Sequence, residues 1–215
     1  SFKRTGFDCG FYQLDVPAHD DDFLLFINGV QVAQHAGCCD SHTNVWTGVL
    51  SANSQVEWQV KQGGGGSYLQ ATFTKLATTQ NVWLGGVSTD WFNTANWCSG
   101  VPTNTTDVLI SGAGPQFMPV IGTSGFGSGA VARNITINGA TAASTYSAAI
   151  AAASLTTANG FNLDVYGNWT NNGTFTANTG SITFRGTSAT PAGYGAQCRA
   201  ARPPTARIRP GPLDA

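Results

Sequence analysis

The sequence predicts an all-β protein, with an antiparallel β-sandwich over residues 1–77 and the start of a right-handed β-solenoid over residues 78–190. Charged residues make up only 10% of the chain, and Glu57 is its single glutamate. Helices in soluble proteins usually carry Glu, Lys, Leu and Arg on their exposed face. Short stretches of alternating apolar and polar residues, separated by turn residues, indicate strands instead.

The N-terminal strands follow from this alternation. Apolar and polar residues alternate over residues 12–16, as in a strand with one buried face. Apolar segments 23–27 and 30–32 then flank Asn28-Gly29, a dipeptide that readily takes the positive φ angles of a type I′ hairpin turn. Further strands are expected over residues 56–60 and 68–73. Short antiparallel strands at this spacing predict a sandwich.

The C-terminal region contains an internal repeat. Thr-Ala-Asn, two apolar residues two positions apart and a glycine occur at residues 157–167 and again 19 residues later at 176–186. Ile135, Ile137 and Gly139 form a fainter third copy. Such a unit cannot bury its apolar pair alone, so stacking on its neighbours predicts a β-solenoid. The irregular spacing leaves a sandwich of meanders as the alternative.

Two segments depart from this pattern. The Ala-rich segment 140–154 has enough helix propensity to predict a short helix. Residues 191–215 are rich in Pro, Ala and Arg, and we expect a disordered tail that is foreign to the natural protein. A basic tail that contacts an anionic polymer is the alternative. Because no initiator Met or signal-peptide pattern begins the sequence, we expect a fragment of a longer protein.

One motif resembles a known family. The triplet Asp20-Asp21-Asp22, followed by the strand and turn of residues 23–29, is similar to the acidic pair and strand–turn–Gly segment of PA14-type domains. Those domains are jelly-roll β-sandwich modules of adhesins, toxins and glycosidases. In their sugar-binding members an adjacent Asp pair ligates a Ca²⁺ ion that binds sugar hydroxyls. The resemblance implies this role for residues within the triplet, among them Asp21 and Asp22.

The later motifs resemble repetitive, strand-rich regions of bacterial surface and autotransporter-like adhesins. The motifs are Trp83-Leu84-Gly85, Trp91, Asn96-Trp97, Pro102, residues 107–110 and the rung-like segment 167–175. This resemblance implies an extracellular location at a bacterial cell surface.

The acidic triplet is also a candidate metal site on its chemistry alone. Clustered carboxylates suit hard cations, so Asp20, Asp21 and Asp22 predict a Ca²⁺ site. Asp40 or Asn44 would complete the shell. A solvated acidic turn is the alternative.

Cysteine and histidine positions allow two interpretations. The residues spaced like zinc ligands are His35, Cys38, Cys39 and His42. A disulfide from Cys9 to Cys38 or Cys39 is favoured instead, because adjacent cysteines seldom point to one ion and an exported protein oxidises its thiols. Cys98 is expected either to pair with the remaining thiol or to stay buried.

Tryptophans are candidate platforms for sugar rings. Trp46 is the best candidate, because it lies in the expected polar loop 42–48, and together with Asn44, Asp21 and Asp22 it forms the predicted ligand-binding set. The alternative is that the tryptophans fill cores, since each buries a large area.

The function expected from these observations is non-catalytic. The sequence lacks a Gly-x-Ser-x-Gly elbow, a phosphate loop, a His-Glu-x-x-His motif and a Cys-x-x-Cys motif. Nucleic-acid binding is not expected, because the only basic cluster lies in residues 191–215. No apolar run is long enough to cross a bilayer.

We therefore expect an extracellular binding or adhesion module, monomeric within a longer chain, whose partner is a glycan or surface polymer. The alternatives are an accessory region of a secreted polysaccharide-degrading enzyme and a structural spacer without a ligand.

Overall fold

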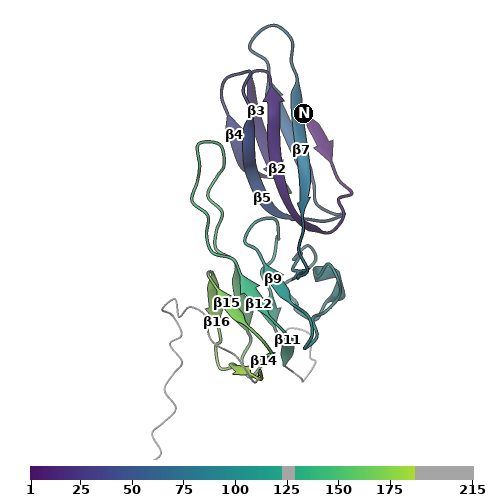
Figure 1. The fold of residues 1–215 in the computed structure, drawn as a ribbon, viewed down its shortest axis with the longest axis vertical. Helices are drawn as coiled ribbons and strands as arrows, with labels where there is room; N and C mark the ends of the chain where they lie inside the picture. Colours follow the sequence, from purple (N-terminus) through teal and green to yellow (C-terminus); the bar gives the residue numbers. More distant parts are fainter. Residues whose placement is uncertain (123–128, 187–215) are drawn as a thin grey trace, which may run out of the picture.

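The computed structural model describes residues 1–122 and 129–186, which form short strands and one short 3₁₀ helix (Figure 1). The all-β prediction is confirmed. Within the described ranges no helix has the length and apolar character needed to cross a membrane. The tail predicted for residues 191–215 lies outside the described residues.

Seven strands form the N-terminal part, which we define as residues 1–77. They are β1 (Phe2–Arg4), β2 (Gly10–His19), β3 (Asp22–Ile27), β4 (Val30–His35), β5 (His42–Leu50), β6 (Val56–Lys61) and β7 (Leu69–Leu76).

The C-terminal part, residues 78–186, holds the remaining elements. They are β8 (Asn81–Val82), the 3₁₀ helix η1 (Thr94–Asn96), β9 (Val108–Ile110), β10 (Val120–Ile121), β11 (Ala130–Ala132), β12 (Ile135–Ile137), β13 (Ser154–Thr157), β14 (Asn162–Val165), β15 (Trp169–Asn171), β16 (Thr174–Thr176) and β17 (Ser181–Phe184).

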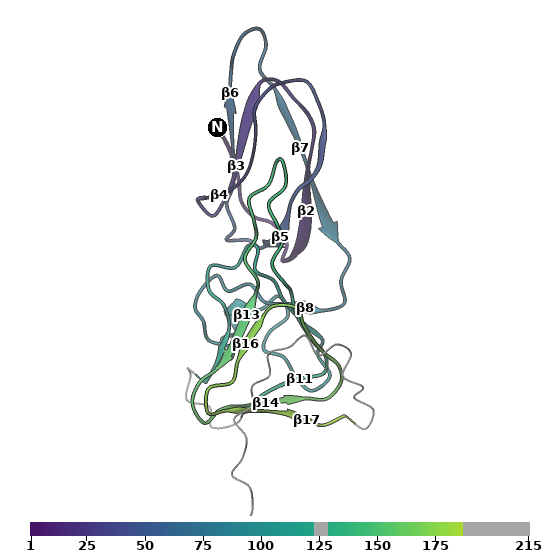
Figure 2. The same cartoon turned by 90° about the vertical axis from the view of Figure 1, so that its left-hand side faces the viewer.

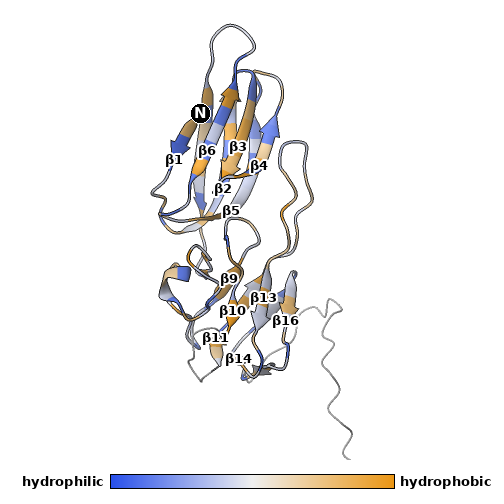
Figure 3. Cartoon of the chain, turned by 180° about the vertical axis from the view of Figure 1, so that it is seen from behind, coloured by the Kyte–Doolittle hydropathy of each residue, from blue (hydrophilic) through white to orange (hydrophobic). Residues whose placement is uncertain are grey.

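Two antiparallel sheets of the N-terminal part share one hydrophobic core. Their strand orders are β1-β6-β3-β4 and β5-β2-β7. Every second residue of β3 and of the first half of β2 is buried, which is the period of a strand with one face on a core. Core side chains of the first sheet are Phe23, Leu25, Ile27, Val56 and Trp58, and those of the second are Leu14, Val16, Val45, Trp46 and Leu50. The hydropathy colouring of Figure 3 makes the apolar character of β3 visible.

The predicted hairpin between β3 and β4 is present. Asn28 and Gly29 have φ angles of 52° and 81°, as the type I′ turn requires. The Asn28 side chain accepts a hydrogen bond from the N–H of Gln55 at 2.9 Å and donates to the carbonyl of Gly114 at 3.3 Å. The turn residue therefore also links the N-terminal part to the C-terminal part.

The expected polar loop over residues 42–48 is wrong, because these residues begin strand β5. The pairing of β5 with β2 shifts register between Leu14 and Val16, and Asn44 in this irregular segment has a φ angle of 53°. The irregularity interrupts the alternation by which a strand is recognised in sequence. Trp46 is only 3% exposed and belongs to the core, so it offers no open face to a sugar ring.

The C-terminal part contains three parallel sheets. Their strand orders are β15-β12-β9-β8, β10-β13-β16 and β11-β14-β17, and from β9 onward consecutive strands in the chain belong to different sheets. Figure 2 shows a roughly triangular outline, with β14 and β17 along one side and β13 and β16 along another. The core of this part includes the buried Trp83, Trp91 and Trp97, and the Trp97 ring meets the other two edge to face.

The 19-residue repeat corresponds to neighbouring strands in one sheet. Leu163 pairs with Ile182 and Val165 with Phe184, as the repeat aligns them. The fainter copy at Ile135 is displaced, because β12 belongs to a different sheet and pairs with β9 and β15. The true neighbour of β14 on its other side is β11.

The turn of the chain through the three sheets that leads from β11 to β14 contains an inserted hairpin. Neighbouring residues Leu163 and Ile182 are 19 positions apart, whereas Ala130 and Leu163 are 33 positions apart. The additional residues include 141–150, here called the arm, in which Thr141 pairs antiparallel with Ile150. The helix predicted over residues 140–154 is therefore wrong. Figures 1 and 2 show the arm extending from the parallel sheets alongside the N-terminal part.

The two parts are joined at several points. Cys9 forms a disulfide with Cys98. The N–H of Val49 donates to the carbonyl of Ala113 at 3.0 Å, and Val49 forms a small buried cluster with Val82 and Leu109. Gly114, with a φ angle of 101°, lies so close to the Val49 backbone that a Cβ would collide with it. Covalent, polar and apolar contacts thus all contribute to this junction.

Candidate functional site

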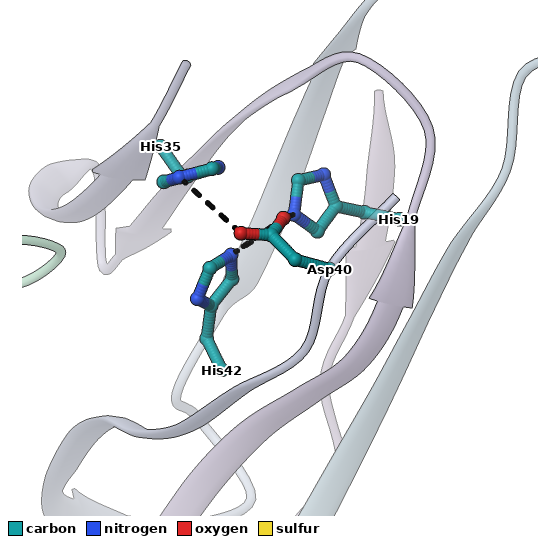
Figure 4. A group of neighbouring side chains, drawn as sticks. All are labelled: His19, His35, Asp40 and His42. Atoms are coloured by element: carbon teal, nitrogen blue, oxygen red, sulfur yellow. Dashed lines mark hydrogen bonds and ion pairs between the residues drawn. The ribbon is translucent and has the colours of Figure 1, made fainter. Parts of the chain in front are cut away.

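The three histidines of the chain all lie in one cluster around the carboxylate of Asp40 (Figure 4). His19 ends β2, His35 ends β4 and His42 begins β5, while Asp40 lies in the connection between β4 and β5. The cluster therefore collects side chains from both antiparallel sheets of the N-terminal part.

Strand register brings these side chains together. His42 pairs with Val16 near the end of β2, and His35 pairs with Phe23 at the start of β3. The connecting loop is fixed by the N–H of Cys39, which donates to the carbonyl of His19 at 3.0 Å. This contact holds the residue after Cys39, Asp40, over the ends of the strands.

The distances within the cluster are short. Nε2 of His19 lies 3.0 Å from Nε2 of His42 and 2.9 Å from Oδ1 of Asp40. Oδ1 of Asp40 is also 3.3 Å from Nε2 of His42, and its Oδ2 is 3.9 Å from Nε2 of His35. Each of the four residues offers one potential ligand atom, and these four atoms all lie within 4.8 Å of one another. The arrangement can bind a cation.

Burial and charge shape the electrostatics of the cluster. His19 and His42 are 0% and 3% exposed, whereas the Asp40 side chain is half exposed. Burial lowers the pKa of His42, and the adjacent imidazoles act in the same direction against the attraction of Asp40. Partial desolvation opposes ionisation of Asp40, but His42, His35 and His19 together outweigh it and lower the pKa of this carboxyl. The surroundings therefore favour a neutral His42 imidazole beside an ionised Asp40 carboxylate.

Aromatic rings enclose the histidines. The Phe23 ring meets the His19 ring edge to face, with centroids 5.0 Å apart. Tyr146, on the arm, lies 4.2 Å from His42 and 5.3 Å from His35 between ring centroids. A residue of the C-terminal part thus covers one side of a site built by the N-terminal part.

The acidic triplet does not join this cluster. The carboxylate of Asp21 accepts hydrogen bonds from the N–H groups of Gly63 and Gly64. That of Asp22 accepts from Gly37 and lies 3.3 Å from Lys61 Nζ, and these two contacts lower its pKa. In residues 1–122 and 129–186, neither of the two groups of closely spaced potential metal ligands contains Asp21 or Asp22.

Asp20 and Asp40 also separate. Asp20 is near the sulfurs of Cys38 and Cys39, whereas Asp40 lies among the histidines. The four carboxylates predicted to share one Ca²⁺ shell therefore face different surroundings.

The predicted ligand-binding set is dispersed as well. The backbone N–H of Asn44 donates to Asp15 Oδ1 at 2.6 Å, and the side-chain carbonyl of Asn44 accepts a hydrogen bond from the Thr47 hydroxyl. With Trp46 in the core, the set Asp21, Asp22, Asn44 and Trp46 does not form one surface.

The disulfide pairing differs from the prediction. Cys9 pairs with Cys98, with Cα atoms 5.5 Å apart, and Cys38 pairs with its neighbour Cys39. The predicted bond from Cys9 to Cys38 or Cys39 is therefore wrong. Because Cys38 and Cys39 form a disulfide with each other, neither can serve as a thiolate ligand beside His35 and His42.

A second feature is an open groove of about 700 Å³ beside the start of the C-terminal part. Its walls come from the segment after β7 and from one parallel sheet, and its lining includes Thr78, Gln80, Asp107, Asn134, Thr136, Asn168 and Thr170. Gln80 donates to the hydroxyl of Thr136 at 3.0 Å. Most of the lining side chains carry a hydroxyl or amide group, and these groups can both donate and accept hydrogen bonds.

No family model, curated protein or solved structure matches the chain. The site must therefore be interpreted from its own geometry.

Sequence reasoning placed His35 and His42 together as metal-ligand candidates but missed His19, Tyr146 and the groove. A signal for His19 was present in the composition, since it is one of only three histidines in the chain. Tyr146 and the groove gave no comparable signal, because they depend on where the arm and the parallel sheets lie.

Proposed function

We propose that this chain is a non-catalytic binding module of an extracellular bacterial surface protein, and that it binds a glycan or related surface polymer. In this proposal residues 1–77 are a PA14-like β-sandwich, residues 78–190 are the start of a right-handed β-solenoid, and the module is monomeric within a longer chain.

The polar groove is the observation that supports this function best. Asn134 and Asn168 immediately precede β12 and β15, which are neighbours in one sheet, and Thr136 pairs with Thr170 across these two strands. Repeated amide and hydroxyl groups on neighbouring strands offer hydrogen bonds at intervals of about 4.8 Å. A polymer of hydroxylated rings presents complementary donors and acceptors at repeated positions.

The charge arrangement favours binding over catalysis. Asp107 is the one carboxylate that lines the groove in the described part of the chain. Its oxygens accept hydrogen bonds from Arg133 and Asn134, and its pKa is lowered chiefly by the Arg133 hydrogen bond. Glycoside hydrolysis normally requires two carboxyl groups, one of which is held protonated. A single ion-paired carboxylate suits binding.

The two disulfides support the extracellular part of the proposal. Disulfides persist in oxidising compartments and are rare in the cytosol. The bond between Cys9 and Cys98 also fixes the N-terminal part to the C-terminal part, which suits a module that presents a surface on a support.

The test is a glycan array probed with untagged protein, followed by affinity electrophoresis on any polysaccharide that binds. Replacing Asn168 and Thr170 together by Ala should weaken binding at least ten-fold, since both side chains line the groove. Thr174→Ala is the matched control, because Thr174 is an exposed threonine on a different sheet. Binding that survives the double replacement would contradict the groove as the site.

The same experiment separates the alternatives. A blank array would support a structural spacer without a ligand. Slow cleavage of a bound polysaccharide by the full-length protein but not by this chain would support an accessory region of a polysaccharide-degrading enzyme. The PA14 resemblance also implies that glycan binding depends on Ca²⁺. Repeating the array with Ca²⁺ or a chelator tests this dependence, and Asp20→Asn tests whether the acidic triplet is responsible for it.

A further inference from the structure

We propose that His19, His35, His42 and Asp40 form a binding site for Zn²⁺. This inference is independent of glycan binding, because the groove and the histidine cluster share no residue.

The spacing of the ligand atoms fits a tetrahedral ion. Metal–ligand distances of about 2.0–2.2 Å place the ligands of a tetrahedral zinc site about 3.3–3.6 Å apart. The contacts among His19 Nε2, His42 Nε2 and Asp40 Oδ1 are 2.9, 3.0 and 3.3 Å. The fourth ligand is Nε2 of His35, which lies 3.9 Å from Asp40 Oδ2. The ligand atoms of all four residues lie within 4.8 Å of one another, so side-chain movements of at most about an ångström would complete the tetrahedron.

The tautomer of His19 is set for coordination. Its Nδ1 lies 2.7 Å from the carbonyl oxygen of Asp21, which can only accept a hydrogen bond. Nδ1 therefore carries the proton, and Nε2 directs a lone pair at the cluster. Zinc-bound histidines commonly have this second contact, which fixes the ring and increases the basicity of the coordinating nitrogen.

Hydrogen bonds alone do not account for the cluster. With the lone pair of His19 Nε2 facing inward, one N–H of His42 must serve both that nitrogen and Asp40. Burying several polar rings with so few donors between them is unfavourable, whereas a cation would engage every inward lone pair.

The donor set selects for zinc over calcium. Three imidazole nitrogens and one carboxylate are ligands that Zn²⁺ accepts readily, while Ca²⁺ requires six or more oxygens. The carboxylate halves the positive charge of the bound ion. Because the Asp40 side chain is half exposed, the ion can reach the buried nitrogens of His19 and His42 from this side.

Zinc binding can be measured on untagged protein freed of metal by a chelator. All measurements should use the Cys198→Ser variant as the parent protein, so that a free thiol cannot bind zinc. Cys198 is the one cysteine outside the two disulfides, and it lies beyond the described residues. Titration with ZnCl₂, followed by calorimetry and by elemental analysis after desalting, should give one Zn²⁺ per chain. Thermal melting should shift upward with zinc, because an ion that binds only the folded state stabilises it. Co²⁺ should give the visible absorption of a tetrahedral nitrogen and oxygen site.

Two variants and one control decide the assignment. Asp40→Asn, at a half-exposed position, and His42→Gln should each weaken zinc binding at least ten-fold and remove the cobalt signal. Asp22→Asn, whose carboxylate contacts Gly37 and Lys61 instead, should bind zinc like the parent. If His42→Gln fails to fold, Asp40→Asn alone decides. Absence of retained zinc, or unchanged affinity in Asp40→Asn, would overturn the proposal.

Discussion

The ring of Tyr146 lies against the ring of His42, with centroids 4.2 Å apart, and so joins the arm to the histidine cluster. The same arm segment accepts a hydrogen bond at its Tyr146 carbonyl from the N–H of Gln34, and the N–H of Ala148 donates to Val32. Ring contact and backbone bonds therefore reinforce one another.

Replacing Tyr146 by Ala should loosen the arm. An aromatic pair contributes about 0.5–1.5 kcal/mol beyond its buried area, so we expect a loss of about 1 kcal/mol in the free energy of unfolding. Hydrogen exchange should be faster at the amides of Gln34 and Ala148. Tyr68→Ala is the control, since Tyr68 is 52% exposed, and its effect should stay below about 0.5 kcal/mol. Unchanged exchange at Gln34 would mean that the ring does not hold the arm.

Removing the disulfide between Cys9 and Cys98 should strongly destabilise the fold. The bond closes a loop with a sequence separation of 89. A crosslink over such a loop lowers the conformational entropy of the unfolded chain and so raises the free energy of unfolding by about 4 kcal/mol. Replacing both cysteines by Ser should lower the urea midpoint accordingly. The matched control replaces Cys38 and Cys39 by Ser. Because those two are sequence neighbours, their bond hardly restricts the unfolded chain, and a comparable loss there would refute this explanation.

Trp46→Ala should behave as a core deletion. The side chain is 3% exposed between the two antiparallel sheets, and truncating a buried Trp costs about 3–5 kcal/mol. Chemical denaturation should report this loss, whereas Val30→Ala at a 65% exposed position should be almost neutral. Near-parental stability of Trp46→Ala would indicate that the ring faces solvent.

Acid should weaken the pair formed by Asp107 and Arg133. The hydrogen bond from Arg133 lowers the pKa of Asp107 in spite of partial burial. A carboxyl group with a lowered folded-state pKa stabilises fully above its unfolded value of about 3.9, and this contribution disappears as the pH falls through the folded value.

Melting temperatures between pH 6 and pH 2 check this sign. The parent protein should lose stability in the acidic part of the range more steeply than Asp107→Asn, which has no carboxyl group to protonate. Arg133→Gln should also flatten the profile, because it removes the main cause of the lowered pKa. Parallel profiles for all three proteins would exclude the pair as a source of acid sensitivity.

The parts of the fold that were predictable depend on short-range patterns. Alternation located β2 and β6, the apolar segments around Asn28-Gly29 located β3, β4 and their hairpin, and the 19-residue repeat marked β14 and β17, which pair as it aligns them. Each of these signals lies within about twenty residues, a scale on which side-chain period and turn chemistry dominate.

The failures share a dependence on distant contacts. The Ala-rich segment 140–154 has local helix propensity, but the arm instead pairs with β4, and tertiary context commonly overrides such weak preferences. Cys9 finds its partner only once the junction with the C-terminal part exists. The histidine cluster likewise requires the registers of two separate strand pairs, which no local pattern in the sequence specifies.

The arm has a consequence for self-association. β4 is the outermost strand of its sheet, and Ala33 on this strand pairs antiparallel with Ser147 of the arm. An uncovered outermost strand is a template on which a second molecule can add its own strand. By occupying that position, a hairpin borrowed from the neighbouring part of the same chain protects the molecule against edge-to-edge aggregation at β4.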